Sequence, residues 1–312
     1  MSEGPPTEVT RWAAERAAAR ASRDFGRADE LRDRIAGAGW EVVDQPGSYT
    51  LRPLGPVEAG PALERISDTD RPGPPPVRRA ASVLVDVEGW PDDAARFLAS
   101  LARHRPSRDV EVVALDRSAT PHPDWPAAWD GPLRILVPET HPGFGAARNA
   151  ALRRAAGEVV VVVDTSLELT GDLLGPLLDA LADPAVAVAG PFGLTTADLR
   201  DYEERTGGEV AAVQGYALAA RRSDLLAVGG FREAFSYYRN ADIDLSLRLR
   251  DLGQPPRRAL AVGADRCRRH AHRAWEATAP EDRDRLSRKN MARVLKRFGH
   301  RLDLAVRPAA SA

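Results

Sequence analysis

Two side chains in the stretch GFGAARNAALRRAAGEVVVVVDTS could together bind a nucleotide diphosphate. Arg148 lies in a run of good helix formers that follows two glycines, and its planar guanidinium can bind phosphate oxygens through two parallel hydrogen bonds. Asp164 follows five consecutive valines, and its carboxylate could hold a divalent cation or a ribose hydroxyl. Because Asp is also a common helix cap, a purely structural interpretation of Asp164 stays open.

A second acidic pair, Asp242 and Asp244 in RNADIDLSLRLR, points to acid–base chemistry. A hydroxyl group is a weak nucleophile, and a carboxylate within hydrogen-bond reach can take its proton as it attacks. The alternative is that both acids only stabilise the N-terminus of a helix through its dipole. Asn240 already offers a cap at this helix start, so two further acids exceed what capping needs, and we favour a general base.

These residues need a scaffold that alternates strands and helices, and the chain has that pattern from Ala81 onward. The valine run is β-branched and apolar enough to be a strand covered on both faces. Ligands of open α/β sheets bind at the carboxyl ends of strands, which is where Asp164 falls. The pattern predicts strands over 82–87, 110–115, 133–137, 159–163 and 185–189, and helices over 92–103, 146–156 and 172–181.

The rest of the chain is less regular. We expect a strand over 210–218, a short helix over 223–228, a helix over 243–252 and a charged amphipathic helix over 280–298 that lies across the sheet. The residues from Arg301 are expected to be frayed.

The order of these motifs from Ser82 to Arg297 resembles that of family 2 glycosyltransferases. The resemblance implies a GT-A fold, the Rossmann-like mixed α/β sheet of nucleotide-diphospho-sugar transferases. In that family the second strand ends in an acid that contacts the base or ribose, here Asp116 in VVALDRSAT, although Asp116 could instead be only a turn former. The donor-binding residues implied by the resemblance are Asp116, Gly145, Arg148, Asn149, Asp164 and Gln214.

The family usually carries an Asp-x-Asp motif that holds a divalent metal between the two phosphates, and here Ser166 replaces the second acid. A hydroxyl is a poorer ligand than a carboxylate for Mn²⁺ or Mg²⁺, so metal binding is expected to be weaker than usual. Family members often have a later histidine ligand, which would be His270 or His272. Imidazoles two residues apart in an extended segment point opposite ways, so at most one faces the site. Alternatively, this Arg/His segment binds the diphosphate by charge or faces solvent.

By the same resemblance the protein is an inverting enzyme that moves a sugar from a UDP-, GDP- or TDP-sugar, with Asp242 as general base. Ala241 stands where the family has a Glu. The acceptor would be a small molecule, a peptide or a carrier-bound group. Aromatic side chains could stack against a sugar ring or lie in the core, and the candidates are Trp125, Phe235, Tyr237 and Tyr238.

Composition excludes several other classes of protein. Lys plus Arg number 44 against 45 Asp plus Glu, so no global charge favours nucleic acid or an anionic membrane. The single cysteine, Cys267, allows no internal disulfide and fits a reducing compartment. No apolar run approaches the ~20 residues of a membrane span, and the first residues lack a signal-peptide pattern. We therefore expect a cytoplasmic protein, with a homo-oligomer possible in principle.

Four regions follow from these patterns: a small N-terminal module over 1–52, a proline-rich linker over 53–80, the GT-A domain over 81–300 and a tail over 301–312. Apolar residues at helical spacing, with Phe25 among them, predict a helical hairpin followed by two short strands in the N-terminal module.

The segment from Arg16 to Tyr49 is similar to the C-terminal tail of cysteinyl-tRNA synthetases, whose tail belongs to the tRNA-binding end. Seven arginines against six acids over 7–39 give no basic surplus, so we expect a docking or structural module, with RNA or carrier recognition as the alternative. Two rival functions remain for the whole chain: a degenerate nucleotide-sugar-binding protein without catalysis, or a nucleic-acid-linked adaptor.

Overall fold

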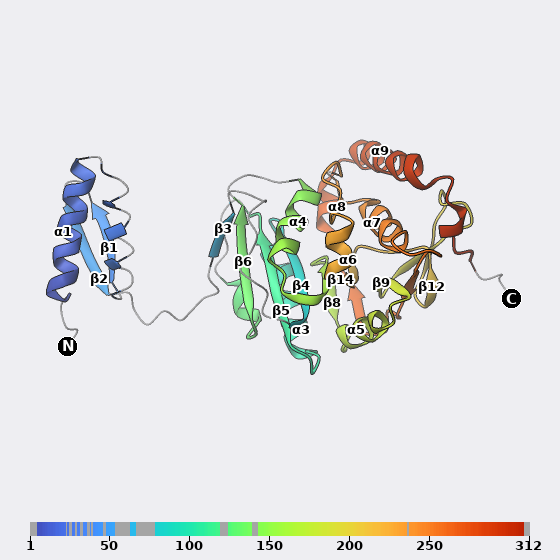
Figure 1. Ribbon diagram of the computed structural model, residues 1–312, viewed down its shortest axis with the longest axis horizontal. Helices are drawn as coiled ribbons and strands as arrows, with labels where there is room; N and C mark the ends of the chain where they lie inside the picture. Colours follow the sequence, from blue (N-terminus) through green and yellow to red (C-terminus); the bar gives the residue numbers. More distant parts are fainter. Residues whose placement is uncertain are drawn as a thin grey trace. The chain divides into compact units, whose positions relative to one another are not determined.

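The computed structural model describes residues 5–22, 24, 27–28, 30–31, 34–35, 38, 40–45, 48–53, 63–66, 79–118, 124–138, 143–235 and 237–308. The chain divides into two compact units, Met1–Gly60 and Pro61–Ala312 (Figure 1). Among the residues listed above, no helix has both the length and the apolar composition needed to cross a bilayer.

The first unit packs a helix on a two-stranded sheet. Helix α1 (Thr7–Ala21) is followed by strands β1 (Trp40–Gln45) and β2 (Ser48–Pro53), which pair antiparallel. The small core contains Val9, Ala13 and Ile35, and five partly buried side chains pack against it: Trp12, Trp40, Val42, Tyr49 and Leu51. The predicted strand pair is present, Ala28 and Leu31 are buried as the helical spacing indicates, and Phe25 lies outside the described residues.

The second unit is built on a mixed sheet of nine strands in the order β12-β15-β9-β14-β7-β4-β5-β6-β3. Strands β7, β4, β5, β6 and β3 run parallel, with β3 at the edge, and β14 is antiparallel to both of its neighbours. The strand bounds are β3 Leu63–Ile66, β4 Arg79–Val87, β5 Val110–Asp116, β6 Leu133–Pro138, β7 Gly157–Val163, β9 Val186–Gly190, β12 Gly208–Val210, β14 Ala217–Arg221 and β15 Arg258–Ala261.

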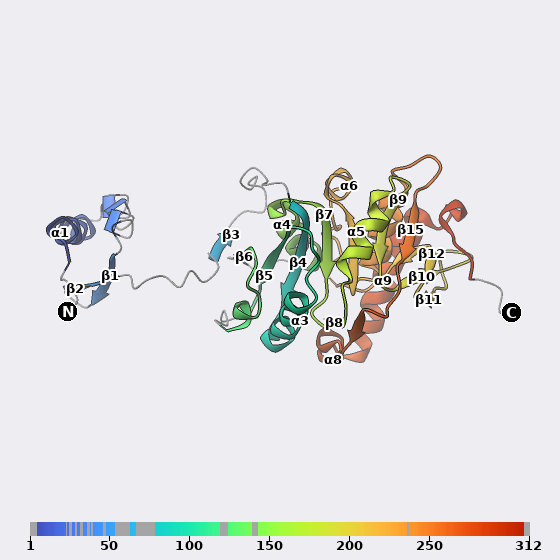
Figure 2. The ribbon, with the colours of Figure 1, turned by 90° about the horizontal axis from the view of Figure 1, so that it is seen from below.

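Helices cover both faces of this sheet, as the continuous apolar strands require (Figures 1 and 2). Helices α3 (Pro91–Arg103) and α5 (Leu174–Ala182) pack with alternate strand residues such as Val83 and Val161 on one face. The other face, which includes Leu84 and Val162, is covered by α4 (Phe144–Arg154), α6 (Arg222–Ala227) and α7 (Ala241–Arg250). Helix α9 (Pro280–Phe298) joins this second core and packs on α7, so it forms an outer layer over a helix.

Short elements complete the unit at the edge that carries the functional residues. They are η1 (Trp125–Ala128), β8 (Leu167–Leu169), β10 (Gly193–Thr195), β11 (Glu203–Arg205), β13 (Ala212–Val213), β16 (Cys267–Arg269), α8 (Arg273–Ala277) and η2 (Leu302–Leu304). Strand β8 pairs with β16, and β10 pairs with both β11 and β13.

The single strand predicted over 210–218 is wrong, because the chain there forms parts of three strands, β12, β13 and β14. A turn at 214–216 interrupts the run: β13 pairs with β10, and the N–H of Gln214 still donates to the carbonyl of Phe192 in that register (2.8 Å), whereas β14 pairs with β7 and β9 in the large sheet. Since the residues on both sides of the turn are buried, the apolar pattern carries no sign of the break.

Two segments expected to be irregular take part in the fold. Within the proline-rich stretch 53–80, β3 pairs parallel with β6 and forms an edge of the nine-stranded sheet. The residues after Arg301 are not frayed up to residue 308: Leu304 is buried, and Thr196 forms a β-bridge with Val306. Arg301 itself is ion-paired with carboxylates of Asp251 and Asp303.

Candidate active site

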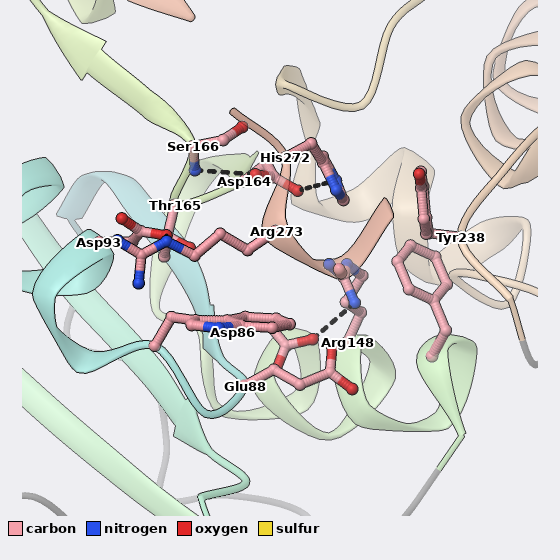
Figure 3. Close-up of a pocket in the computed structure, with 13 residues that line it drawn as sticks. Asp86, Glu88, Asp93, Arg148, Asp164, Thr165, Ser166, Tyr238, His272 and Arg273 are labelled. Atoms are coloured by element: carbon pink, nitrogen blue, oxygen red, sulfur yellow. Dashed lines mark hydrogen bonds and ion pairs between the residues drawn. The ribbon is translucent and has the colours of Figure 1, made fainter. Parts of the chain in front are cut away.

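A cavity of about 480 Å³ lies at the carboxyl end of β7, where the sequence predicts the site. Arg148, Asp164 and Asp242 all line it, although they are far apart in the chain. A smaller pocket, shown in Figure 3, shares Arg148, Asp164 and His272 with the cavity and continues toward Asp86 and the start of α3. Of the sequence candidates Asp116, Arg148, Asp164 and Asp242, the last three therefore lie at one cavity.

Asp164 is held by contacts on both carboxylate oxygens (Figure 3). Its Oδ1 accepts from the N–H of Ser166 at 2.8 Å, and its Oδ2 lies 2.9 Å from Nε2 of His272. Burial acts to raise the pKa of Asp164, but the hydrogen bond and charge of His272 outweigh it and leave this pKa below its ordinary value. The pKa of His272 is raised, because Asp164 outweighs the opposing effect of burial. Asp164 and His272 thus form a pair in which each side chain stabilises the charged form of the other.

The donor set around Asp164 fits one hard divalent cation. The hydroxyl of Ser166 is buried and has no hydrogen-bond partner, so it is available as a further oxygen ligand. In the described parts of the chain, no group of three or more His, Cys, Asp or Glu side chains could hold a metal ion. A cation at Asp164, Ser166 and His272 would therefore need additional oxygen ligands from a phosphate or water.

The histidine ring must change its protonation to take part in such a site. Its Nδ1 accepts from the N–H of Trp275 at 3.1 Å, so in the neutral ring the proton lies on Nε2 and faces Asp164. To bind a cation through Nε2, His272 has to release or move this proton. The N–H of Trp275 retains a second acceptor, the His272 carbonyl at 2.9 Å, so the start of α8 keeps a hydrogen bond.

His270 does not reach the cavity, and its assignment as a metal ligand is wrong for this structure. Its Nε2 lies 2.7 Å from the Glu168 carboxylate, on the β8–β16 side of the segment. The alternation of side chains in an extended segment, which limits one of the two histidines to the site, selects His272.

Arg148 projects into the site from α4 and is neutralised by an unexpected carboxylate, Asp86 at the end of β4. The Arg148 Nη1 to Asp86 Oδ2 distance is 2.7 Å (Figure 3). Asp86 also accepts two hydrogen bonds from Arg117, at 2.9 and 2.7 Å. The Arg148 guanidinium further stacks on Phe144, at 3.6 Å from the ring centre. These contacts fix the position of the Arg148 guanidinium beside Asp164, and the Asp86 carboxylate balances its charge.

Asp116 stands at the end of β5 as predicted, but its carboxylate is used inside the protein. It is buried, and it accepts from the N–H of Ser118 at 2.9 Å and from the indole of Trp125 at 3.3 Å. It does not line either pocket described above. The structural interpretation of Asp116 as a turn former matches these contacts, and the strand-end carboxylate that lines the smaller pocket is Asp86.

Two further donor-binding assignments from the glycine-rich segment are corrected by the packing. The amide of Asn149 donates to the carbonyl of Phe231 and accepts from the N–H of the same residue, both at 2.8 Å, so it ties α4 to the loop that follows α6. Gly145 faces the backbone of Arg232, where a Cβ would lie 2.6 Å from the carbonyl oxygen. Both residues are needed for close packing and neither points into the cavity.

Asp242 lies in the first turn of α7 and lines the cavity. Its Oδ2 accepts from the N–H of Gly215 at 2.9 Å, and its Oδ1 accepts from the N–H of Ile243 at 3.0 Å. Burial raises the pKa of this carboxyl, and these N–H groups and the charge of Arg239 only partly oppose the effect. Gln214 also lines the cavity and donates to Glu204 at 2.8 Å.

Asp244 has a structural role. It is 1 % exposed and pairs with Arg248 at 2.7 Å and with Arg232 at 3.6 Å. Of the two acids of the motif, Asp242 lines the cavity and can contact a ligand, whereas Asp244 does not line it.

Aromatic side chains form much of the cavity wall. Tyr238, one of the sequence candidates, lines the cavity and stacks on the His272 ring at a centroid distance of 4.6 Å. Trp125 and Phe235 are core residues with at most 2 % exposure. The rest of the aromatic lining comprises Phe144, Tyr202, Tyr216, Phe231 and Trp275. No local signal distinguishes these from core aromatics, because their common surface forms only when distant segments meet.

Comparison with known proteins identifies the second unit. The sequence model of the family described as Glycosyl transferase family 2 matches residues 87–243, just over half of the chain. The chain belongs to this family. Its fold is similar to that in the crystal structure of GalNAc-T7 with UDP, GalNAc and Mn²⁺, with a TM-score of 0.59 and 16% sequence identity. That match covers 72% of this chain, which spans about half the length of GalNAc-T7.

The predicted α/β fold of GT-A type is therefore confirmed.

The first unit is similar to a different class of protein, the cysteine–tRNA ligases. It is 48% identical over 48 residues to the cysteine–tRNA ligase of Opitutus terrae and 54% identical over 45 residues to that of Geobacter metallireducens. These matches cover 15% and 14% of this chain, and the chain spans about a tenth of the length of each ligase. The resemblance of this small segment is confirmed.

Proposed function

We propose that this family 2 glycosyltransferase transfers a sugar from a nucleotide-sugar donor to an acceptor nucleophile, with inversion at the anomeric carbon. The observation that carries the proposal is that Arg148, Asp164 and Asp242 line one cavity of about 480 Å³. Such a volume suits a sugar-sized ligand, and the three side chains supply a cation, a carboxylate for a metal and a carboxylate base.

The donor would be a UDP-, GDP- or TDP-sugar, with its diphosphate between Arg148 and Asp164. A divalent cation, Mn²⁺ or Mg²⁺, would be held by Asp164, Ser166 and His272, and when bound it supplies positive charge to the departing diphosphate. Arg148 adds a fixed guanidinium on the side of Asp86. The GalNAc-T7 structure with UDP and Mn²⁺ supports a nucleotide and metal for this fold.

Asp242 would act as the general base of a single displacement. The acceptor hydroxyl transfers its proton to the Asp242 carboxylate while its oxygen forms the new bond to the anomeric carbon. The bond from that carbon to the diphosphate oxygen breaks, and the leaving group keeps the electron pair. Because its pKa is raised, the Asp242 carboxylate is a better proton acceptor than an ordinary carboxylate.

The acceptor side is defined by aromatic and polar groups around Asp242. Tyr202, Tyr238 and Trp275 can stack on the apolar faces of a sugar or another ring-containing acceptor. A small molecule, a peptide or a carrier-bound group fits this wall. The single cysteine supports a reducing, cytoplasmic setting for the reaction.

A screen of nucleotide sugars against the whole chain tests the proposal. Thermal-shift and calorimetric titrations with and without Mn²⁺ identify the donor, and release of nucleoside diphosphate then measures turnover, with water as the default acceptor. We expect one nucleotide class to bind more tightly with Mn²⁺ and to be turned over. Binding without turnover, unchanged in Asp242→Asn, would favour a degenerate sugar-nucleotide-binding protein, which the Ser166 and Ala241 replacements suggest.

For the first unit we propose a docking role. Its similarity to part of the cysteine–tRNA ligases favours RNA recognition as a second candidate, while the balanced charge over 7–39 opposes it. Filter binding of the full chain to tRNA at two salt concentrations separates the two: salt-sensitive, saturable retention would support an RNA-linked adaptor.

A further inference from the structure

Arg269, at the end of β16, does not line the cavity itself but contacts three other segments of the chain close to it. Its Nη1 and Nη2 bind the two carboxylate oxygens of Glu204 on β11, at 2.7 and 2.9 Å. The same guanidinium lies over the rings of Phe192 and Tyr216, 4.2 and 5.1 Å from their centres. Glu204 in turn accepts from the side chain of Gln214 at 2.8 Å. The contacts converge on the turn at 214–216.

This turn forms a hydrogen bond with each of the two acids of the site. The N–H of Gly215 donates to Asp242 at 2.9 Å, and the carbonyl of Tyr216 accepts from the N–H of Asp164 at 3.0 Å. Two successive residues of one turn therefore contact the residue proposed as base and the residue proposed as metal ligand. A shift of the turn would move both contacts together.

We propose that Arg269 is a positioning residue, which through Glu204 and Tyr216 holds the 214–216 turn so that Asp242 and Asp164 face the same donor. The inference rests on the proposed function of this cavity. It assigns to Arg269 no contact with substrate: the residue acts through the turn.

The geometry requires arginine and not only a positive charge. A guanidinium can bind both oxygens of Glu204 in one plane while its flat face covers an aromatic ring, whereas an ammonium can do only one of these well. The hydrogen bond from Arg269 and that from Gln214 lower the pKa of Glu204, which keeps the pair ionised. Arg269, Glu204 and Phe192 do not line the cavity, so a ligand does not compete for the bidentate pair, while Tyr216 links this support to the cavity wall.

Loss of this support should alter the titration of Asp242. The charged and titratable groups near its carboxylate are Arg239, which lowers its pKa, and Tyr202, whose own pKa Asp242 helps to raise. The N–H groups of Gly215 and Ile243 also stabilise the ionised form. Of these, the Gly215 N–H belongs to the turn that Arg269 supports. If that N–H moves away, the ionised form of Asp242 loses a donor and its pKa rises further.

The test compares Arg269→Lys and Glu204→Gln with the wild type and with a control, Arg258→Lys. Arg258 forms an exposed pair with Asp183 at 2.5 Å and does not line the cavity, so it reproduces the loss of an Arg–carboxylate pair at a remote place. Calorimetry measures the affinity for the donor found in the screen, and nucleoside diphosphate release gives kcat from pH 5 to 9. Titration of ¹³C-labelled aspartate carboxyls reports Asp242 directly, with its signal assigned by its absence in Asp242→Asn.

We expect both variants to keep donor affinity within about twofold and to lose about tenfold or more in kcat, since small misplacements of reacting groups are costly. The low-pH limb of kcat and the Asp242 signal should both move to higher pH, while Arg258→Lys matches the wild type. If kcat, the limb and the signal are all unchanged in Arg269→Lys and Glu204→Gln, the positioning role is refuted. If the wild type shows no turnover, the proposed function fails by itself, and the carboxyl titration still decides whether Arg269 sets the surroundings of Asp242.

Discussion

Replacing Asp242 by Asn separates the chemical role of this residue from its structural one. The carboxamide keeps the size of the side chain and one acceptor oxygen, but it cannot take a proton from an acceptor hydroxyl. General bases contribute about 10² to 10⁴ to a rate, which corresponds to roughly 3–5 kcal/mol of transition-state stabilisation. We therefore expect kcat to fall at least about a hundredfold, with donor affinity unchanged, since Asp242 lies on the acceptor side of the cavity.

The stability of the same variant follows from the raised pKa of Asp242. An acid whose pKa is raised by folding is penalised in its ionised form, so the penalty is complete above the folded-state pKa and disappears as the pH falls to the unfolded-state value. Asn mimics the protonated acid and avoids the penalty. The thermal midpoint of Asp242→Asn should therefore equal or exceed that of the wild type at pH 8, and the difference should vanish near pH 4.

Asp244→Asn, two residues along the same helix, is the matched control. Asp244 and its partner Arg248 are 1 % and 4 % exposed, and removal of one charge from such a pair costs about 3–5 kcal/mol. For a unit of this size the midpoint should drop by about 6 to 20 °C. Initial rates of nucleoside diphosphate release and thermal denaturation followed by circular dichroism measure both variants. Turnover by Asp242→Asn within about threefold of the wild type would refute the general-base argument.

Three further outcomes follow from the site. Removal of metal with EDTA should weaken donor binding, and His272→Ala should reduce the Mn²⁺-dependent gain in affinity by at least about tenfold, whereas His270→Ala leaves it within twofold; equal effects in calorimetry would contradict the ligand choice. Arg148→Lys should weaken nucleoside diphosphate binding by about tenfold, because lysine lacks the planar fork, and a titration with unchanged affinity would count against its phosphate role. Asn149→Ala should cost about 1–3 kcal/mol for each of the two Phe231 backbone groups left without a partner, measured by urea denaturation; a stability equal to the wild type would contradict this assignment.

The ordering of strands and helices was accessible from the sequence because it depends on local patterns. The valines of β7 and the helix formers of α4 define their elements through side-chain shape and periodicity, which neighbouring residues carry by themselves. The same holds for Asp164, whose position at the end of a buried strand places it at the ligand-binding edge. The histidine partner of Asp164 could not be chosen in the same way, since both His270 and His272 follow a strand. The contacts in the structure show that His272 pairs with Asp164 and His270 with Glu168.

Errors arose where two interpretations of one residue differ only in tertiary contacts. Asp116 and Asp86 both stand near the ends of parallel strands. The Asp116 carboxylate accepts a hydrogen bond from the indole of Trp125, whereas the Asp86 carboxylate binds two guanidiniums, those of Arg117 and Arg148. Asn149 carries the polarity of a ligand-binding residue, yet it completes the hydrogen bonds of a distant loop. A polar side chain satisfied within the protein looks the same in sequence as one directed at a ligand.

The amino-acid sequence by itself determined the class of this protein: an α/β domain with family 2 motifs in order, an acid after the central strand, an arginine on the helix before it and an acid at the start of a later helix. These properties reside in contiguous residues, where hydrophobic period and residue type act over a few positions. The tertiary structure alone decided which histidine meets Asp164, which carboxylate neutralises Arg148, and that Arg269 supports the turn between the two acids. Those choices depend on side chains 60 or more residues apart, such as Arg269 on the β16–β8 sheet and Glu204 on the separate β11–β10–β13 sheet, and no local pattern encodes their distance.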